Sequence, residues 1–255
     1  MARRRKSNRR RRRGSFGFLY KLLSTLVICA AVVAALTLFF RVDAIQVTGV
    51  ERYTAQEVTD ASGVEQGDNL FLLNKYSVDQ NIKAALPYVE ELRINRSLPD
   101  TLVIQVRECG TPMAVVQDGS AWLVSPAGKI VEQAEAAAAE QYALIDGCQL
   151  LAPAVGTSLA LATEYAAQQQ SLLDLLAALE EAALVEQVDA IHLGDLSVLR
   201  MEYAGRFVVE LPYGADYAYK LRSLTASLEI GAIQDNQTGT IQLTGDDGKV
   251  SFIPD

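Results

Sequence analysis

The chain has 255 residues, half of them hydrophobic, and a formal net charge of −8 that is distributed very unevenly. Residues 1–41 carry eleven basic and no acidic residues, whereas residues 42–255 carry the other 12 basic and all 31 acidic residues, a net charge of −19. This asymmetry argues against a uniform soluble globule and against a protein that binds nucleic acid along its whole length.

Residues 22–40 form an uncharged, apolar segment, and two basic clusters at 3–6 and 9–13 precede it. A helix of this length spans about 28 Å, close to the ~30 Å hydrocarbon core of a bilayer. The sequence therefore predicts a basic cytoplasmic tail, 1–21, and one transmembrane helix, 22–40, with everything beyond it outside the cytoplasm. A cleaved signal peptide is disfavoured because its apolar core is usually ~7–15 residues long.

The arginine clusters allow a second interpretation, a patch that binds nucleic acid. Because these residues lie beside a membrane span, their role in setting the orientation of the span is enough to explain them. Attraction to anionic lipids would strengthen the membrane contact further. We therefore expect contact with membrane lipids and no nucleic-acid partner.

Residues 42–109 are predicted to form a compact α+β unit that begins with a β-rich segment, 42–50. Thr54 then stands three residues before Glu57, the spacing of a capping box, and predicts a short helix that stops at Gly63.

A second helix is predicted to begin with Ser77 as its cap and to end at Pro87, which cannot continue it. Two segments of alternating hydrophobicity, 89–96 and 101–109, then predict two strands joined by a turn. The predicted order of the unit is β-α-α-β-β.

Residues 110–255 are predicted to form a mixed, β-rich domain with flanking helices. Asp118-Gly119 predicts the turn of a hairpin. A helix is predicted to start at Thr163 and to run to about Leu184, with one buried stripe at helical spacing. The stripe consists of Leu172, Leu176, Leu179 and Ala183.

Further along, the segments 197–203 and 206–211 alternate around Ala204-Gly205 and predict a second hairpin. A helix over 215–231 and a final strand pair complete the domain. The strand pair is formed by the segments 240–245 and 249–254.

His192 is the only histidine in the chain, so a catalytic triad or dyad that uses a histidine must include it. No Cys, Asp or Glu stands at a spacing around it that makes a catalytic or metal site, so a structural role is the default. Nucleophile and phosphate-loop signatures are also absent from the sequence. We therefore predict no enzyme activity, no catalytic residue, no cofactor, no metal ion and no small-molecule substrate.

The chain has three cysteines, of which Cys29 lies in the predicted span. Cys109 and Cys148 fall outside it, where oxidation is possible. The sequence leaves open whether they form a disulfide or remain two free thiols.

Four parts of the sequence resemble the FtsQ/DivIB family of bacterial cell-division proteins. They are the basic tail with its single span, and the segments FRVDAIQVTGVERYTAQEV (40–58), LPYVEELRINRSLPDTLVIQVREC (86–109) and DGSAWLVSPAGKIVE (118–132). The resemblance implies a POTRA domain at 42–109 followed by the family's β domain at 110–255.

The resemblance also implies a function: a single-pass type II membrane protein at the division septum that acts as a divisome scaffold. In the family, the outer domains bind FtsB (DivIC) and FtsL, and the complex regulates septal cell-wall synthesis. The family's partner surface, carried over to this chain, is Thr244, Gly245, Asp247, Lys249, Val250, Ser251, Phe252 and Ile253.

The sequence pattern alone is compatible with this partner surface, because 249–254 is a terminal strand and terminal strands often leave an edge unpaired. Phe252 is then either an anchor for a partner or, together with Val250, packed on the sheet. A POTRA-bearing export or substrate-delivery protein is the main alternative, and a membrane-anchored cell-wall enzyme is the third.

Overall fold

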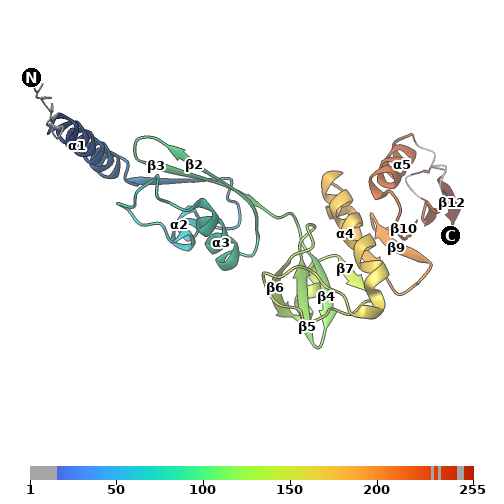
Figure 1. The fold of residues 1–255 in the computed structure, drawn as a ribbon. Coiled ribbons are helices and arrows are strands. Elements are labelled where there is room, and N and C mark those ends of the chain that lie inside the picture. Colours follow the sequence, from blue (N-terminus) through green and yellow to red (C-terminus); the bar gives the residue numbers. More distant parts are fainter. Residues whose placement is uncertain (1–15, 231–232, 235–236, 246–249) are drawn as a thin grey trace, which may run out of the picture. The chain divides into compact units, whose positions relative to one another are not determined.

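The computed structural model describes residues 16–230, 233–234, 237–245 and 250–255, and it begins with the long helix α1 (Phe16–Phe39; Figure 1). In this part of the chain, α1 is the one helix that is long and apolar enough to cross a membrane, over Gly17–Thr37. The predicted fold class is confirmed: an apolar N-terminal helix, a POTRA-like α+β unit and a β-rich region.

Two sheets follow α1. Their elements are β1 (Ala44–Thr48), α2 (Ala55–Ser62), α3 (Lys75–Ala85), β2 (Val89–Ser97), β3 (Thr101–Glu108), β4 (Met113–Gln117), β5 (Ser120–Val124), β6 (Ile130–Glu135), η1 (Ala136–Gln141), β7 (Leu144–Asp146), η2 (Thr163–Tyr165), α4 (Ala166–Glu181), η3 (Val185–Gln187), β8 (Val188–His192), β9 (Val198–Tyr203), β10 (Phe207–Pro212), α5 (Tyr217–Glu229), β11 (Gly239–Gln242) and β12 (Ser251–Pro254).

The contacts within the chain define two compact units. One contains the chain up to residue 46 together with 65–73 and 95–103, and the other contains 47–64, 74–94 and everything from 104 onward. The domain limits 42–109 and 110–255 remain a prediction.

The first sheet has the strand order β1-β3-β2, and α2 and α3 pack against each other beside it. The predicted β-α-α-β-β order is therefore confirmed. Val58 from α2, Ile82 from α3 and Ile104 from β3 are fully buried, as expected for helices and strands that each present one apolar face to a core.

The N-terminus of α2 carries the predicted capping box. The Thr54 hydroxyl accepts a hydrogen bond from the Glu57 N–H at 3.2 Å, and the Glu57 carboxylate accepts one from the Thr54 N–H at 2.7 Å. Gly63 ends the helix with a left-handed φ of 67°. Each bond satisfies a backbone donor that the first helical turn would otherwise leave unpaired.

Replacing Thr54 with alanine is expected to lower the free energy of unfolding of this unit by about 1 kcal/mol, because the helix loses its cap. Urea unfolding followed by circular dichroism would measure the loss. Thr59→Ala is a matched control, since the Thr59 hydroxyl only bonds back to the Ala55 carbonyl within the same helix. Equal effects of both variants would contradict the capping role.

The start of α3 corrects the prediction. The helix begins at Lys75 with Asn74 as its cap, whose side chain accepts a hydrogen bond from the Tyr76 N–H at 3.1 Å. Ser77, the predicted cap, lies inside the first turn. Asn and Ser cap helices about equally well, so their order in the sequence did not decide between them.

The second sheet has nine strands in the order β12-β11-β10-β9-β8-β7-β4-β5-β6. Both predicted hairpins are present, β4–β5 around Asp118-Gly119 and β9–β10 around Ala204-Gly205. All four of these turn residues have positive φ; two residues, 118–119, separate the paired ends of β4 and β5, and three, 204–206, separate those of β9 and β10.

The helices α4 and α5 contact each other and bury their apolar faces in the core of this sheet. Leu172, Leu176 and Leu179 are fully buried as predicted, but Ala183 is exposed, beyond the helix, with a φ of 55°. Leu175 fills the stripe instead. The helix starts at Ala166, because residues 163–165 form a separate 3₁₀ turn.

The predicted helix over 215–231 corresponds to α5, with Asp216 as its cap. Its predicted last residue, Gly231, lies outside the described residues. The side chain of Lys220 on α5 is buried, and its amine donates a hydrogen bond to the Gly245 carbonyl. This contact connects α5 to the loop that leads to the last strand.

Candidate functional site

The strand β12 forms one end of the nine-stranded sheet (Figure 1). It pairs antiparallel with β11, which in turn pairs parallel with β10. Along its other side, no strand of the described structure lies next to β12. The terminal segment predicted as an edge strand is therefore an edge strand.

Two contacts define which way the backbone of β12 faces. The N–H of Asp255 donates to the Thr238 carbonyl at 3.2 Å, toward β11. The carbonyl oxygen of Ile253 also faces β11, so closely that a side-chain carbon on Gly239 would overlap it. Because backbone groups alternate along an antiparallel strand, every second residue of β12 bonds to β11.

The residues between them face the free edge. Phe252 therefore directs its N–H and its C=O away from β11, where another strand could pair with them. Pro254 lies at the next outward position and has no N–H to offer, a common way of limiting an edge. The accessible edge is short and centres on the backbone of Phe252.

The side chains of β12 divide between two faces. Phe252 is half-buried, and its ring meets Phe207 edge-on with 6.1 Å between the centroids. Val250 also packs against the core, which agrees with the alternative that Phe252 and Val250 pack on the sheet. Ile253 is 51% exposed and Ser251 is exposed, so Ile253 is the apolar side chain of β12 that a partner can reach.

The other predicted contact residues precede the strand. Thr244 and Gly245 are exposed in the loop after β11. Asp247 and Lys249 lie outside the described residues. Sequence reasoning missed two residues that support this surface, Gly239 and Lys220. The spacing of Lys220 from the buried Tyr217, Leu221 and Leu224 was the available signal.

The face of the sheet that carries Ile253 also carries a row of polar side chains in register across neighbouring strands. The row ends next to Ser251 on β12. Its members are Asp146, His192, Arg200, Glu210 and Gln242.

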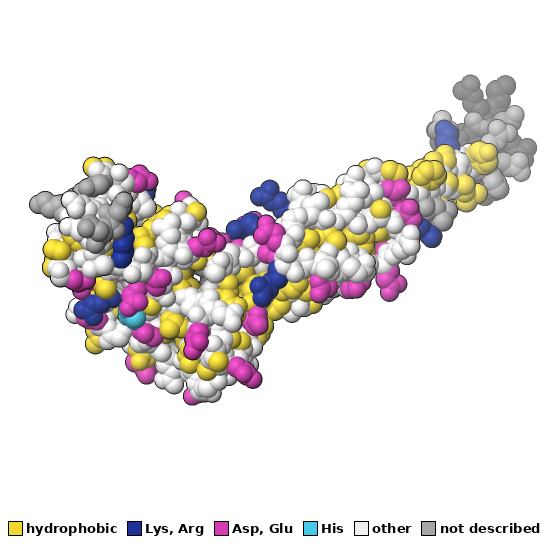
Figure 2. All heavy atoms as spheres, turned by 180° about the vertical axis from the view of Figure 1, so that it is seen from behind, with side chains coloured by type: hydrophobic (Ala, Val, Ile, Leu, Met, Phe, Trp, Pro, Cys, Tyr) yellow, Lys and Arg dark blue, Asp and Glu magenta, His cyan; other side chains and the backbone are white. Residues whose placement is uncertain are grey.

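These side chains are hydrogen-bonded to one another. The Arg200 guanidinium donates to Glu210 at 3.2 Å, and Gln242 donates to the same carboxylate at 3.1 Å. His192 lies between two carboxylates, with Nδ1 2.8 Å from Asp146 and Nε2 3.2 Å from Glu202. In Figure 2 the histidine lies on the surface among acidic and basic side chains. Its spacing in the sequence gave no hint of these partners, because they come from neighbouring strands.

The pKa of His192 lies above its ordinary value of 6.5. Partial burial of the ring lowers it, but the hydrogen bonds and charges of Asp146 and then Glu202 outweigh burial and raise it. Both ring nitrogens can donate only when the imidazole is protonated. The charged histidine therefore stabilises this face of the sheet.

We expect the His192 contribution to stability to be complete below about pH 6.5 and to disappear as the pH rises through the higher pKa of the folded state. The loss should be about 1 kcal/mol or less, because the group is partly exposed. Comparing the pH dependence of unfolding for the wild-type chain and His192→Gln would test this. Identical pH profiles would contradict it.

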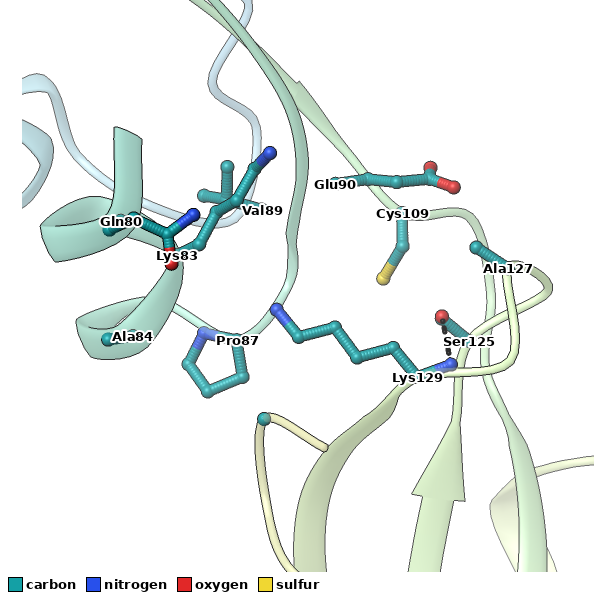
Figure 3. A pocket seen from close by; sticks show the side chains of 11 residues that line it. Gln80, Lys83, Ala84, Pro87, Val89, Glu90, Cys109, Ser125, Ala127 and Lys129 are labelled. Atoms are coloured by element: carbon teal, nitrogen blue, oxygen red, sulfur yellow. Dashed lines mark hydrogen bonds between the residues drawn. The ribbon is translucent and has the colours of Figure 1, made fainter. Parts of the chain in front are cut away.

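A cavity of about 440 Å³ lies beside α3 and β2 (Figure 3). Its lining includes Lys83, Glu90, Cys109 and Lys129. Burial raises the pKa of the Cys109 thiol to about 11, so the thiol is protonated at neutral pH and is a poor nucleophile. Burial lowers the pKa of Lys129, whose side chain extends toward Pro87 in Figure 3.

The two cysteines beyond the helix are free thiols, which settles the alternative left open by the sequence. Burial raises the pKa of Cys148 to about 11 as well. Among the described residues, no group of three or more His, Cys, Asp or Glu side chains is placed to hold a metal ion.

Residues 40–108 match the family model of the FtsQ-type POTRA domain. The chain is 36% identical over 83 residues to the cell division protein FtsQ of Corynebacterium glutamicum, covering 32% of this chain and 37% of that one. It is 30% identical over 111 residues to FtsQ of Geotalea daltonii (44% and 40%) and 28% identical over 95 residues to the cell division protein DivIB of Clostridium botulinum (37% of each). The matched part thus spans less than half the length of these curated relatives.

The three-stranded sheet with its two helices is accordingly a POTRA domain of the FtsQ type. Over this part the chain is similar to the cell-division proteins FtsQ and DivIB.

Proposed function

We propose that this chain is a membrane-anchored scaffold of the bacterial division machinery, and that it acts by binding and not by catalysis. Its partners are other single-span division proteins of the FtsB/DivIC and FtsL type, and the complex helps to regulate septal cell-wall synthesis. The observation that carries the proposal is the free edge of β12, which presents the backbone of Phe252 beside the exposed Ile253.

The edge is suited to β-augmentation, in which a partner strand pairs with an exposed strand through main-chain hydrogen bonds. Ile253 offers an apolar anchor next to these bonds. A hollow of about 230 Å³ beside the β9–β10 turn lies next to the end of β12 and is lined by Asp189, Glu202 and Asp255, among others. Arg206 also lines the hollow, so three carboxylates and one guanidinium leave the lining net acidic, which favours a basic side chain on the partner.

The apolar helix α1 supports membrane anchoring, and the basic residues before it support an inside N-terminus with the folded part outside. We propose the division septum as the location. Tethering beside other membrane-anchored proteins raises the effective concentration of this scaffold for them.

The full-length chain in nanodiscs, titrated with the outer segment of an FtsB/DivIC-like protein, would test the proposed interface. We expect Ile253→Lys to weaken binding at least about tenfold, since an anchor at an interface typically contributes more than 1 kcal/mol. Leu151→Lys is the matched control, because Leu151 is a similarly exposed aliphatic residue (55%) in the segment after β7, which is the fifth strand from β12 in the sheet. Equal binding by both variants would contradict the β12 interface.

A further inference from the structure

We propose that residues 69–72 form a second membrane contact, in which the side chains of Phe71 and Leu72 insert into the lipid interface beside the end of α1. The inference rests on the membrane anchoring proposed above. The partner is the bilayer on the side of the folded domains, and the contact would hold the POTRA domain against that surface.

This loop is fastened to the last turn of α1. The Asn69 side-chain amide donates to the carbonyl oxygens of Leu36 and Thr37 at 3.5 and 3.4 Å. The Leu70 N–H donates to the Phe40 carbonyl at 2.9 Å. These carbonyls belong to the end of α1, where the Leu36 carbonyl also accepts from the Phe40 N–H at 3.3 Å and the Thr37 carbonyl also accepts from the Arg41 side chain at 3.4 Å. The loop therefore lies at the depth where α1 leaves the bilayer.

The side chains beyond this attachment are apolar and uncovered. Phe71 is 49% exposed and Leu72 is 79% exposed. The Phe71 ring meets Phe40 edge-on at 4.9 Å, and both loop side chains share an apolar hollow of about 230 Å³ with Val33 and Leu36 of α1. Val33 lies six residues before the end of α1 at Phe39, about 9 Å deeper along the helix. Interfacial segments bury apolar side chains by about 5–10 Å, a comparable depth.

The backbone N–H groups of the loop are already hydrogen-bonded. The N–H groups of Phe71 and Leu72 donate to the side-chain oxygen of Asn69 at 2.9 and 3.2 Å, and the Leu73 N–H donates to the Asn69 carbonyl at 3.1 Å. An unpaired N–H raises the free energy where water is scarce. A loop whose N–H groups are bonded in this way can therefore enter the lipid interface at a low free-energy cost.

The loop belongs to the same compact unit as the predicted membrane helix. Residues 65–73 fall in the same compact unit as α1, and Leu70 is fully buried there. Arg41 and Asn69 form an antiparallel bridge that joins the two segments. The apolar loop therefore moves with the span, and its exposed surface continues that of α1.

Tryptophan fluorescence in vesicles that contain lipids brominated close to the headgroup would test the insertion. The full chain has one tryptophan, Trp122, which gives the baseline. We expect Leu72→Trp to lose most of its added fluorescence to the brominated lipid. Gln46→Trp is the control, since Gln46 is an exposed residue of the same unit six residues beyond Phe40, or about 20 Å along an extended chain. It should lose no more than the baseline.

Val32→Trp separates this inference from the anchoring on which it rests, because Val32 is an exposed residue within α1. Quenching of Val32→Trp with no quenching of Leu72→Trp or Phe71→Trp would overturn the lipid contact alone. No quenching of Val32→Trp would overturn the anchoring itself. Quenching of Val32→Trp and Leu72→Trp, with Gln46→Trp at the baseline, would support the inserted loop.

Discussion

Replacing Phe207 with alanine is expected to lower the free energy of unfolding of the nine-stranded sheet by about 3–5 kcal/mol. Phe207 is 2% exposed, is among the largest fully buried side chains, and lies beneath Phe252 of the edge strand. The variant loses the buried ring and leaves a cavity in a close-packed core. The edge strand should lose its support together with the core.

Urea unfolding of the full chain in micelles would measure this effect. Trp122 is a suitable probe, since it lies on β5 of the same sheet and packs against its core. Tyr219→Ala is the control, because Tyr219 is 43% exposed and such surface substitutions usually change stability by about 0.5 kcal/mol or less. A loss for Phe207→Ala as small as that of the control would show that the ring does not support the sheet.

Replacing Gly239 with alanine is expected to displace β12 and to weaken partner binding at least about tenfold. The new methyl group would overlap the Ile253 carbonyl oxygen and crowd the Pro254 backbone. Overpacking of this kind costs about 1–3 kcal/mol, and a short edge strand has few other contacts to resist it. The φ of 150° at Gly239 adds strain for any residue with a side chain.

Gly119→Ala is the matched control for this prediction. Gly119, in the β4–β5 turn, also has a positive φ, 76°, but a methyl group there meets no atom within 4 Å. The control therefore carries the backbone strain without the overlap. Binding of the partner that is reduced equally in the two variants would mean that the position of β12 does not matter.

The sequence was most informative where the pattern is local. Alternating apolar residues located β2 and β3, and the spacing of Thr54 and Glu57 located the start of α2. The dipeptides Asp118-Gly119 and Ala204-Gly205 between alternating segments located both hairpins. Each of these signals depends only on neighbours in the chain. The order of elements in the POTRA domain could therefore be predicted correctly.

The predicted helix ends were wrong where two local signals in the sequence competed or where the period continued past the helix. Asn74 and Ser77 are equivalent as caps, so only the packed helix reveals which one serves. Ala183 fits the helical period, but the chain leaves the helix before it. The period continues in the sequence even when the helix does not.

The candidate site could be predicted only in outline. Its location on the last strand came from the family resemblance and from the strand's terminal position. The strand order, which makes β12 an edge, is set by pairing between distant segments. The same pairing brings Asp146 and Glu202 to His192 and turns Phe252 toward the core, which no local pattern reveals.

Amide hydrogen exchange at Phe252 tests the central claim most directly, because partner binding by strand addition must protect its outward N–H. The full chain in nanodiscs would be measured at residue resolution with and without the outer segment of the FtsB/DivIC-like partner. We expect the Phe252 amide to exchange quickly alone and slowly in the complex, while the Ile253 amide, which faces β11, is slow in both. A partner that binds without slowing exchange at Phe252 would contradict the account.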